Sequence, residues 1–157
     1  GKIALRLATK LAERGDQPVA LIRNPEHVKD VEAAGAEPAV LDLEKATVTE
    51  LTEKMMNADA VVFAAGAGPG SGAARKDTVD RKASVLCADA ASLAGARRFV
   101  QISAIGVDEP VAEDAGEVWA AYVEAKRAAD ADLRERHLEL DWTILRPGRL
   151  THDPGTG

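Results

Sequence analysis

DAVVFAAG, residues 59–66, is the stretch that decides the fold class. It is an apolar run of strand length that ends on small residues, and both faces of such a strand must be covered by other elements. Shorter runs of the same kind recur along the chain at regular intervals. The sequence therefore predicts strands at 18–22, 37–43, 59–66, 97–103 and 141–147.

Between these runs, apolar residues recur every three to four positions, which predicts amphipathic helices. Leu7 and Leu11 mark the first helix, and Gly15 is placed to end it. Thr47 followed by Glu50 predicts a capping box at the start of another. The expected helices cover 2–14, 25–34, 47–56, 78–94 and 117–137, and the expected loops cover 67–77 and 104–116.

This alternation of helices and strands predicts a single α/β domain over 1–157 with a Rossmann-type, doubly wound parallel sheet. Such a sheet normally begins with a strand that becomes central, whereas this chain begins with a helix. We therefore expect a strand before Gly1. The end of the chain reads as a loop, so we also expect further elements after Gly157.

The composition excludes several classes of protein. The 157 residues carry a net charge of −6, which disfavours nucleic acid as a partner. Apolar runs fall short of the roughly 20 residues that a membrane span needs, so we expect no membrane association. The single cysteine, Cys87, fits a reducing compartment, and we expect a cytoplasmic protein. His27, His137 and His152 are scattered, which predicts no metal site.

In open α/β sheets, ligands lie beyond the carboxyl ends of the strands. A helix that begins with Gly1, Lys2 and Ile3 offers free amides to a pyrophosphate, although an ordinary helix start has the same form. Arg23 follows the first strand, where an acid would bind the ribose of NAD and an arginine suits the 2′-phosphate of NADP. The nearest acid is Glu26. The alternative for Arg23 is a solvated side chain.

The next two strand ends also carry residues suited to a nucleotide. Asp42 can accept the adenine amino group while Leu43 packs on the ring, or Asp42 is a turn residue. Ala64, Ala65 and Gly66 are small enough for a dinucleotide to lie across the sheet edge, or they form a tight turn.

Tyr122 and Lys126 are four residues apart on one predicted helical face, and Ser103 ends the preceding strand. A tyrosine hydroxyl can exchange a proton with a substrate oxygen, and a nearby ammonium lowers the tyrosine pKa. Ser103 can hydrogen-bond the same substrate oxygen. The alternative is a half-buried core tyrosine beside a surface lysine.

Taken together, these segments resemble the short-chain dehydrogenase/reductase superfamily. The likeness is greatest to its atypical NAD(P)H-binding group, which is similar to NmrA and biliverdin-IXβ reductase and belongs to the NAD-dependent epimerase/dehydratase superfamily. The matching segments are GKIA at 1–4, VALIRNP at 19–25, LDL at 41–43, DAVVFAAG at 59–66, RRFVQIS at 97–103, YVEAK at 122–126 and DWTILRPG at 141–148.

The resemblance implies a role for each matching position. Gly1 and Ala4 stand in the family's glycine-rich loop, and Tyr122 and Lys126 match its catalytic pair. Ser103 is followed by Ala104, where the family often has a second serine. The cofactor-binding residues implied are Gly1, Lys2, Ile3, Arg23, Asp42, Leu43, Ala64, Ala65, Gly66, Ile102, Lys126, Pro147 and Gly148.

The function expected from these features is an NADP(H)-dependent oxidoreductase that prefers NADP(H) over NAD(H). Its small-molecule substrate would be a carbonyl, a quinone or a flavin-like compound. Two alternatives stay open: a non-catalytic regulator that senses NADP(H), and a sugar-nucleotide epimerase or dehydratase. The sequence leaves the oligomeric state open.

Overall fold

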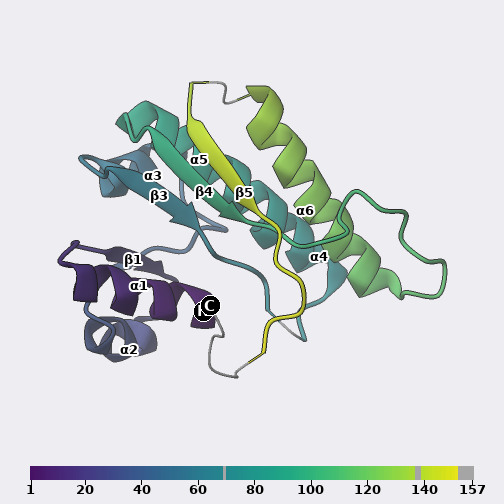
Figure 1. The fold of residues 1–157 in the computed structure, drawn as a ribbon, viewed down its shortest axis with the longest axis horizontal. Helices are drawn as coiled ribbons and strands as arrows, with labels where there is room; N and C mark the ends of the chain where they lie inside the picture. The colour runs from purple at the N-terminus through teal and green to yellow at the C-terminus, as the bar shows by residue number, and fades with distance from the viewer. Residues whose placement is uncertain (69, 137–138, 152–157) are drawn as a thin grey trace.

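The computed structural model describes residues 1–68, 70–136 and 139–151. Helices and strands alternate along the chain, as the sequence predicts (Figure 1). In chain order they are α1 (Lys2–Arg14), β1 (Val19–Ile22), the 3-10 turn η1 (Pro25–His27), α2 (Val28–Ala33), β2 (Glu37–Val40), α3 (Val48–Met55), β3 (Ala60–Phe63), α4 (Ala73–Arg75), the π-helical η2 (Lys76–Lys82), α5 (Ala83–Ala94), β4 (Arg98–Ile102), α6 (Glu117–Arg136) and β5 (Asp141–Leu145).

The strands form parallel sheets, which confirms the predicted fold class. β1 pairs with β2, and β4 pairs with both β3 and β5. Among the described residues, these two sheets are not hydrogen-bonded to each other. Figure 1 shows α1 and α2 beside β1, whereas α3, α5 and α6 lie along the sheet formed by β3, β4 and β5. The helices α3, α5 and α6 share one core with β3, β4 and β5, whereas Leu145 of β5 is 48% exposed.

Alternate residues of β1 face two different cores. Ala20 and Ile22 pack with α1 and α2 around buried Val31. Leu21 packs instead against the larger core, in which Leu51 and Phe99 are fully buried. Both faces of β1 are thus covered, as expected for a parallel strand. Four alanines of α5 also belong to the larger core, and their small side chains let this helix approach the sheet closely: Ala83, Ala88, Ala90 and Ala91.

Local signals position the helices. Gly15 ends α1 with φ of 92°, a left-handed conformation that glycine adopts without strain. The predicted capping box is present, because Thr47 and Glu50 each accept a backbone N–H of the other. Gly35 (φ +78°) lies against α1 so closely that a Cβ atom would stand 2.6 Å from Ala12 Cβ.

Several predicted boundaries are wrong. The loop expected over 67–77 already becomes helical at Ala73, because the glycine-rich stretch ends at Gly72 and good helix formers follow. The expected strands 37–43 and 59–66 are shorter in the structure, ending at Val40 and Phe63. The apolar runs continue beyond the last hydrogen-bonded pairs. His137, His152 and the final loop, 153–157, lie outside the described residues.

Candidate active site

Lys126 is the most deeply placed cation at the carboxyl edge of the β3–β4–β5 sheet. It is 4% exposed, its Nζ donates to the Ile102 carbonyl at 3.0 Å, and it lies 3.4 Å from Asp80 Oδ1. Burial lowers the pKa of Lys126, and the negative charge of Asp80 opposes that effect. The ammonium is therefore fixed in position at the end of β4.

Tyr122 lies one helical turn before Lys126 and is partly buried. Lys76 Nζ and Lys126 Nζ lie 5.7 and 6.0 Å from the centre of its ring. Burial nevertheless raises the pKa of Tyr122, and the charges of Asp80 and Asp130 raise it further. The expected lowering of this pKa by Lys126 is therefore not seen, because burial and the two carboxylates raise it.

Asp80 ties the glycine-rich loop to this lysine. Its side chain is 2% exposed, and Oδ2 accepts the Ala67 backbone N–H at 3.1 Å. A Cβ atom at Gly66 would stand 3.0 Å from Asp80 Oδ1, so glycine gives the carboxylate room. Ala64 and Ala65 are partly buried just before it, and Lys76 donates to the Gly68 carbonyl at 2.9 Å.

Ser103 is brought to the same edge, but its hydroxyl has a buried partner. The side chain is 3% exposed, and its Oγ donates to Asp130 Oδ2 at 2.9 Å. Asp130 is 0% exposed and also accepts from Gln101 at 2.6 Å and from Arg146 at 2.8 and 2.9 Å. In this arrangement, Ser103 links β4 to α6.

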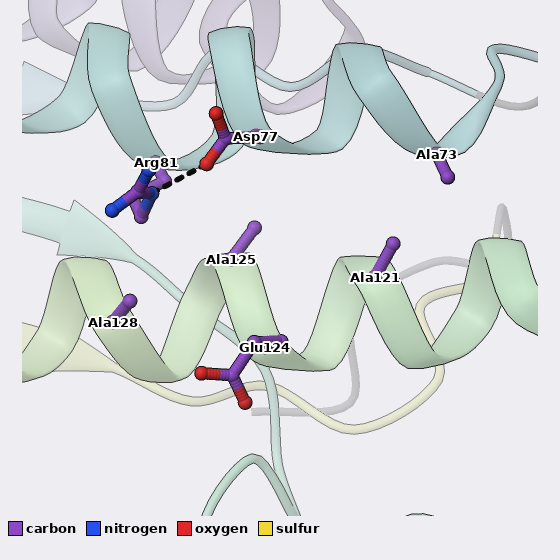
Figure 2. A pocket seen from close by; sticks show the side chains of 7 residues that line it. All are labelled: Ala73, Asp77, Arg81, Ala121, Glu124, Ala125 and Ala128. Carbon is purple, nitrogen blue, oxygen red and sulfur yellow. Dashed lines mark hydrogen bonds and ion pairs between the residues drawn. The ribbon is translucent and has the colours of Figure 1, made fainter.

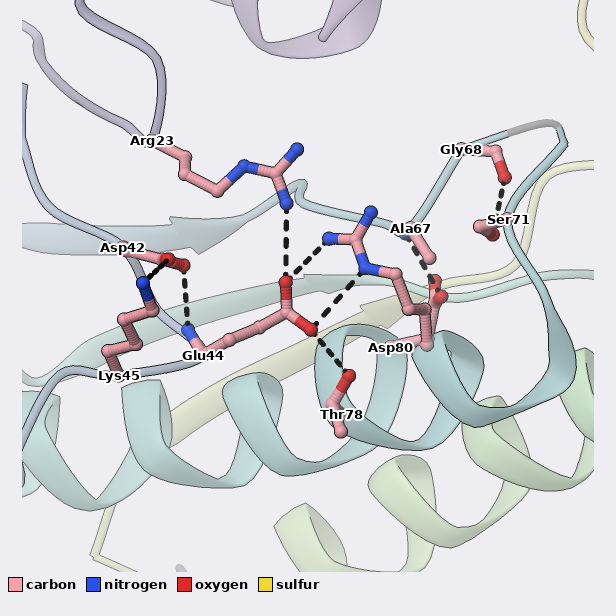
Figure 3. A network of polar contacts seen from close by, with 10 residues as sticks. Arg23, Asp42, Glu44, Lys45, Ala67, Gly68, Ser71, Thr78 and Asp80 are labelled. Carbon is pink, nitrogen blue, oxygen red and sulfur yellow. Dashed lines mark hydrogen bonds and ion pairs between the residues drawn. The ribbon is translucent and has the colours of Figure 1, made fainter.

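Arg23 lies at the other end of the candidate site, beyond β1. Its NH1 is 3.2 Å from Glu44 Oε2, and Arg75 and Thr78 bind the same carboxylate (Figure 3). Asp42 is partly buried nearby, and its Oδ1 accepts the Glu44 backbone N–H at 3.1 Å, the turn contact considered as the alternative. Leu43 packs against the larger core.

The remaining predicted positions are exposed, except for the partly buried Pro147. Gly1, Lys2 and Ile3 are exposed at the start of α1, toward which β3, β4 and β5 point in Figure 1. The carbonyl of Pro147 accepts the Ile105 backbone N–H at 3.0 Å, and Gly148 is exposed.

A shallow groove of about 320 Å³ lies elsewhere, between η2 and α6 (Figure 2). Small residues and the Asp77–Arg81 ion pair line it. It uses a face of α6 that presents Ala121 and Ala128, and its lining includes none of the predicted site residues.

Two further features can be stated for the described residues. They include no group of three or more His, Cys, Asp or Glu side chains that could hold a metal ion. They also include no helix with the length and apolar character needed to cross a membrane.

The whole chain, residues 1–157, matches a protein family described as NAD(P)H-binding. The chain belongs to this NAD(P)H-binding family. The resemblance inferred from the sequence segments, and the Rossmann-type fold that it implies, are therefore confirmed.

Three similar proteins illustrate the family. The UPF0659 protein YMR090W of Saccharomyces cerevisiae is 36% identical over 166 residues, covering 100% of this chain and 69% of that protein. YhfK of Bacillus subtilis, named as an uncharacterized sugar epimerase, is 34% identical over 158 residues. The match covers 100% of this chain and 72% of YhfK. A solved structure described as a putative NAD-dependent epimerase/dehydratase from Bacillus halodurans is 34% identical, with a TM-score of 0.87. The match covers 100% of this chain and 70% of that chain.

Sequence reasoning did not assign Glu44, Arg75, Lys76, Asp80 and Asp130 to this region of the NAD(P)H-binding domain. Asp130 had a detectable signal, since it follows Tyr122 and Lys126 at the same four-residue spacing. Asp80 had none, because an acid in a predicted helix is usually solvent-exposed.

Proposed function

We propose that this protein is an NADP(H)-dependent oxidoreductase that reduces, or in reverse oxidises, a small carbonyl, quinone or flavin-like substrate. One observation carries the proposal. Lys126 is buried at the end of β4, held by the Ile102 carbonyl and Asp80, one helical turn from the partly buried Tyr122. This arrangement fixes a cation and a proton-donating hydroxyl at the edge of the sheet where ligands of this fold bind.

The residues of the chain fit an NADP(H) cofactor. Arg23 and Arg75 already hold a carboxylate where the adenosine phosphate would lie, so an anion is accommodated there. The amides at the start of α1 suit the pyrophosphate. The other proposed contacts are Lys2 and Ile3 near the pyrophosphate, Asp42 and Leu43 at the adenine, Ala64, Ala65 and Gly66 at the adenosine ribose and diphosphate, Ile102 and Lys126 at the nicotinamide ribose, and Pro147 and Gly148 at the nicotinamide.

When bound, the nicotinamide supplies or accepts the hydride at the substrate carbon. In the reductive direction, the Tyr122 hydroxyl donates its proton to the substrate oxygen as the carbon–oxygen double bond becomes single. The raised pKa of Tyr122 keeps that proton in place until it is needed. Lys126 orients the cofactor, since an ammonium has three donors and the described residues supply two partners. Ser103 acts as a positioning residue through Asp130.

The test is Tyr122→Phe, with Trp119→Phe as the matched control on the neighbouring exposed ring. NADPH oxidation is followed with quinone, flavin and carbonyl substrates, and NADPH binding is titrated separately. We expect kcat to fall about 100-fold or more in Tyr122→Phe, because general acid catalysis is lost, while the dissociation constant of NADPH changes less than about twofold. Unchanged turnover in Tyr122→Phe contradicts the proposal. A second contradicting result is that the wild type and both variants bind NADPH but turn over none of these substrates. The second result supports a non-catalytic NADP(H) sensor.

The names of two similar proteins favour a second candidate, a sugar-nucleotide epimerase or dehydratase. An epimerase must retain its oxidised cofactor through the cycle, so the purified protein would release NAD on denaturation. It would also convert a nucleotide sugar without added cofactor. The oxidoreductase predicts exchangeable NADP(H) and net consumption of it. The free, buried thiol of Cys87 agrees with a cytoplasmic location, which we propose for either activity.

A further inference from the structure

Lys76 is a second buried lysine beside Tyr122. It is 8% exposed at the start of the π-helical η2, and its Nζ donates to the Gly68 carbonyl at 2.9 Å. The same Nζ lies 5.7 Å from the centre of the Tyr122 ring, which Lys126 Nζ approaches to 6.0 Å. Two ammonium groups, one from η2 and one from α6, therefore lie close to the ring that carries the proposed proton donor.

The two lysines differ in what balances their charge. Lys126 lies 3.4 Å from Asp80 Oδ1, whereas no carboxylate forms an ion pair with Lys76 among residues 1–68, 70–136 and 139–151. Burial lowers the pKa of Lys126, and repulsion by the charge of Lys76 lowers it further. Buried charges are normally paired with an opposite charge. The two lysines and Asp80 together carry a net positive charge, which an anion would neutralise.

Lys76 also has hydrogen-bonding capacity that the described residues do not use. An ammonium group has three donors, and within the described part of the chain the Gly68 carbonyl accepts one of them. The neighbouring segment 67–72 is rich in glycine. A Cβ atom added at Gly68, Gly70 or Gly72 would meet no atom within 4 Å apart from its chain neighbours. These glycines put no side chain over the ammonium group, and the space beside them is open.

We propose that Lys76 binds a carboxylate group of the substrate, and that the protein reduces small carbonyl compounds that carry such a group. The inference rests on the proposed oxidoreductase function and names the substrate class of that site. The position of Lys76 favours a group of the substrate over a phosphate of the cofactor, because Lys76 lies beside the ring of Tyr122, the proposed proton donor to the substrate.

The carboxylate takes no part in the bond changes. The carbonyl carbon gains the hydride from NADPH, and the carbonyl oxygen gains the proton of Tyr122 as the double bond becomes single. NADP⁺ and a hydroxy acid leave, and solvent returns a proton to Tyr122. Lys76 holds the charged end of the substrate throughout, so its contribution is expected in substrate binding rather than in the chemical step.

The experiment compares two acids with their methyl esters, because each ester keeps the carbonyl group and loses the negative charge. The acids are phenylglyoxylate and 4-formylbenzoate, which place the carboxylate at two different distances from the carbonyl carbon. Benzoquinone is a further neutral probe. NADPH oxidation by the full-length protein gives kcat and KM for each probe, and the binding of NADPH is titrated separately.

The variants are Lys76→Gln, which removes the charge, and Lys76→Arg, which keeps it. Lys82→Gln is the matched control, since Lys82 ends the same helix and its side chain is 63% exposed. Thermal unfolding of each variant shows that it is folded.

We expect the wild type to have a kcat/KM at least about tenfold higher for one of the acids than for its ester. Lys76→Gln should lower kcat/KM for that acid about 30-fold, mainly through a higher KM, because a charge-assisted hydrogen bond is lost. Lys76→Arg should recover part of this loss. Turnover of the ester and the dissociation constant of NADPH should stay within about twofold of the wild type, and Lys82→Gln should match the wild type for every probe.

Three results overturn the inference. The wild type could prefer neither acid over its ester. Lys76→Gln could lower the turnover of acid and ester equally, which would make Lys76 a support for the segment 67–72. It could instead weaken the binding of NADPH, which would make Lys76 a cofactor contact.

Turnover of the neutral probes separates this inference from the proposed function. A wild type that reduces benzoquinone or the esters with NADPH, but prefers neither acid, overturns only the substrate class. A wild type that binds NADPH and reduces none of the probes contradicts the proposed function together with the inference.

Discussion

At the scale of a single residue, burial determines the chemistry of Cys87. The side chain is 3% exposed within the core, and burial raises the pKa of its thiol to about 12. Only the thiolate attacks disulfide reagents, so we expect no labelling of the folded protein by an aromatic disulfide reagent at pH 8. Full labelling should follow unfolding in urea. The absorbance of the aromatic thiol that the reagent releases measures the labelling of the folded and of the unfolded protein.

The same shift has a pH consequence. The folded chain holds Cys87 as the neutral thiol, whereas the unfolded chain ionises near the ordinary pKa of 9.0. The free energy of unfolding should therefore decline as the pH rises from about 9 toward 12. Cys87→Ala lacks this component and is the control. Labelling of the native protein as fast as in urea would show that the thiol is accessible, contrary to the structure.

At the scale of an element, the capping box decides how firmly α3 begins. The Thr47 backbone N–H donates to Glu50 Oε2 at 2.8 Å, and the Glu50 backbone N–H donates to Thr47 Oγ1 at 3.2 Å. Thr47→Ala removes the side-chain acceptor, and we expect the free energy of unfolding to fall by about 1 kcal/mol. Urea denaturation followed by circular dichroism measures the change.

Thr49→Ala is the matched control, since Thr49 is an exposed threonine within the same helix. Alanine has the higher helix propensity, so this variant should lose no stability beyond about 0.5 kcal/mol. Equal losses in the two variants would show that α3 does not depend on its cap.

The elements themselves were largely predictable, because they depend on local patterns. Periodicity located α1, α5 and α6, and the residue types of Thr47 and Glu50 predicted a cap that the structure contains. The start of α4 was not predictable in this way. Its short run follows a stretch rich in glycine, and the π-helical turns of η2 have no comparable sequence pattern.

At the scale of the whole molecule, the site depends on contacts that only the topology creates. Glu44 and Arg75 are 31 residues apart and belong to different connections. The end of β1 was predicted at Ile22, where the structure has it, so Arg23 follows that strand as expected. Its carboxylate partner could not be predicted, because Glu44 reaches it from a turn beyond a different strand.

Asp130 is the residue on which the parts of the larger sheet converge, because it accepts hydrogen bonds from β4, from the segment after β4 and from the segment after β5. Asp130→Asn leaves one acceptor oxygen for donors that now occupy two. It also removes the buried partner of Arg146. We expect the free energy of unfolding to fall by about 3 kcal/mol or more, measured by urea denaturation, because a buried pair is broken on one side.

Asp108→Asn is the control for Asp130→Asn, because it also removes a carboxylate partner of Arg146 but from an exposed position. Asp108 also binds Arg146, but its side chain is 59% exposed and the interaction is screened by water. This variant should lose about 1 kcal/mol or less. The difference between the two substitutions then measures what burial adds to the same charge pair. Comparable losses would mean that Asp130 stabilises only its own contact, and that β4, β5 and α6 are held together by their apolar packing.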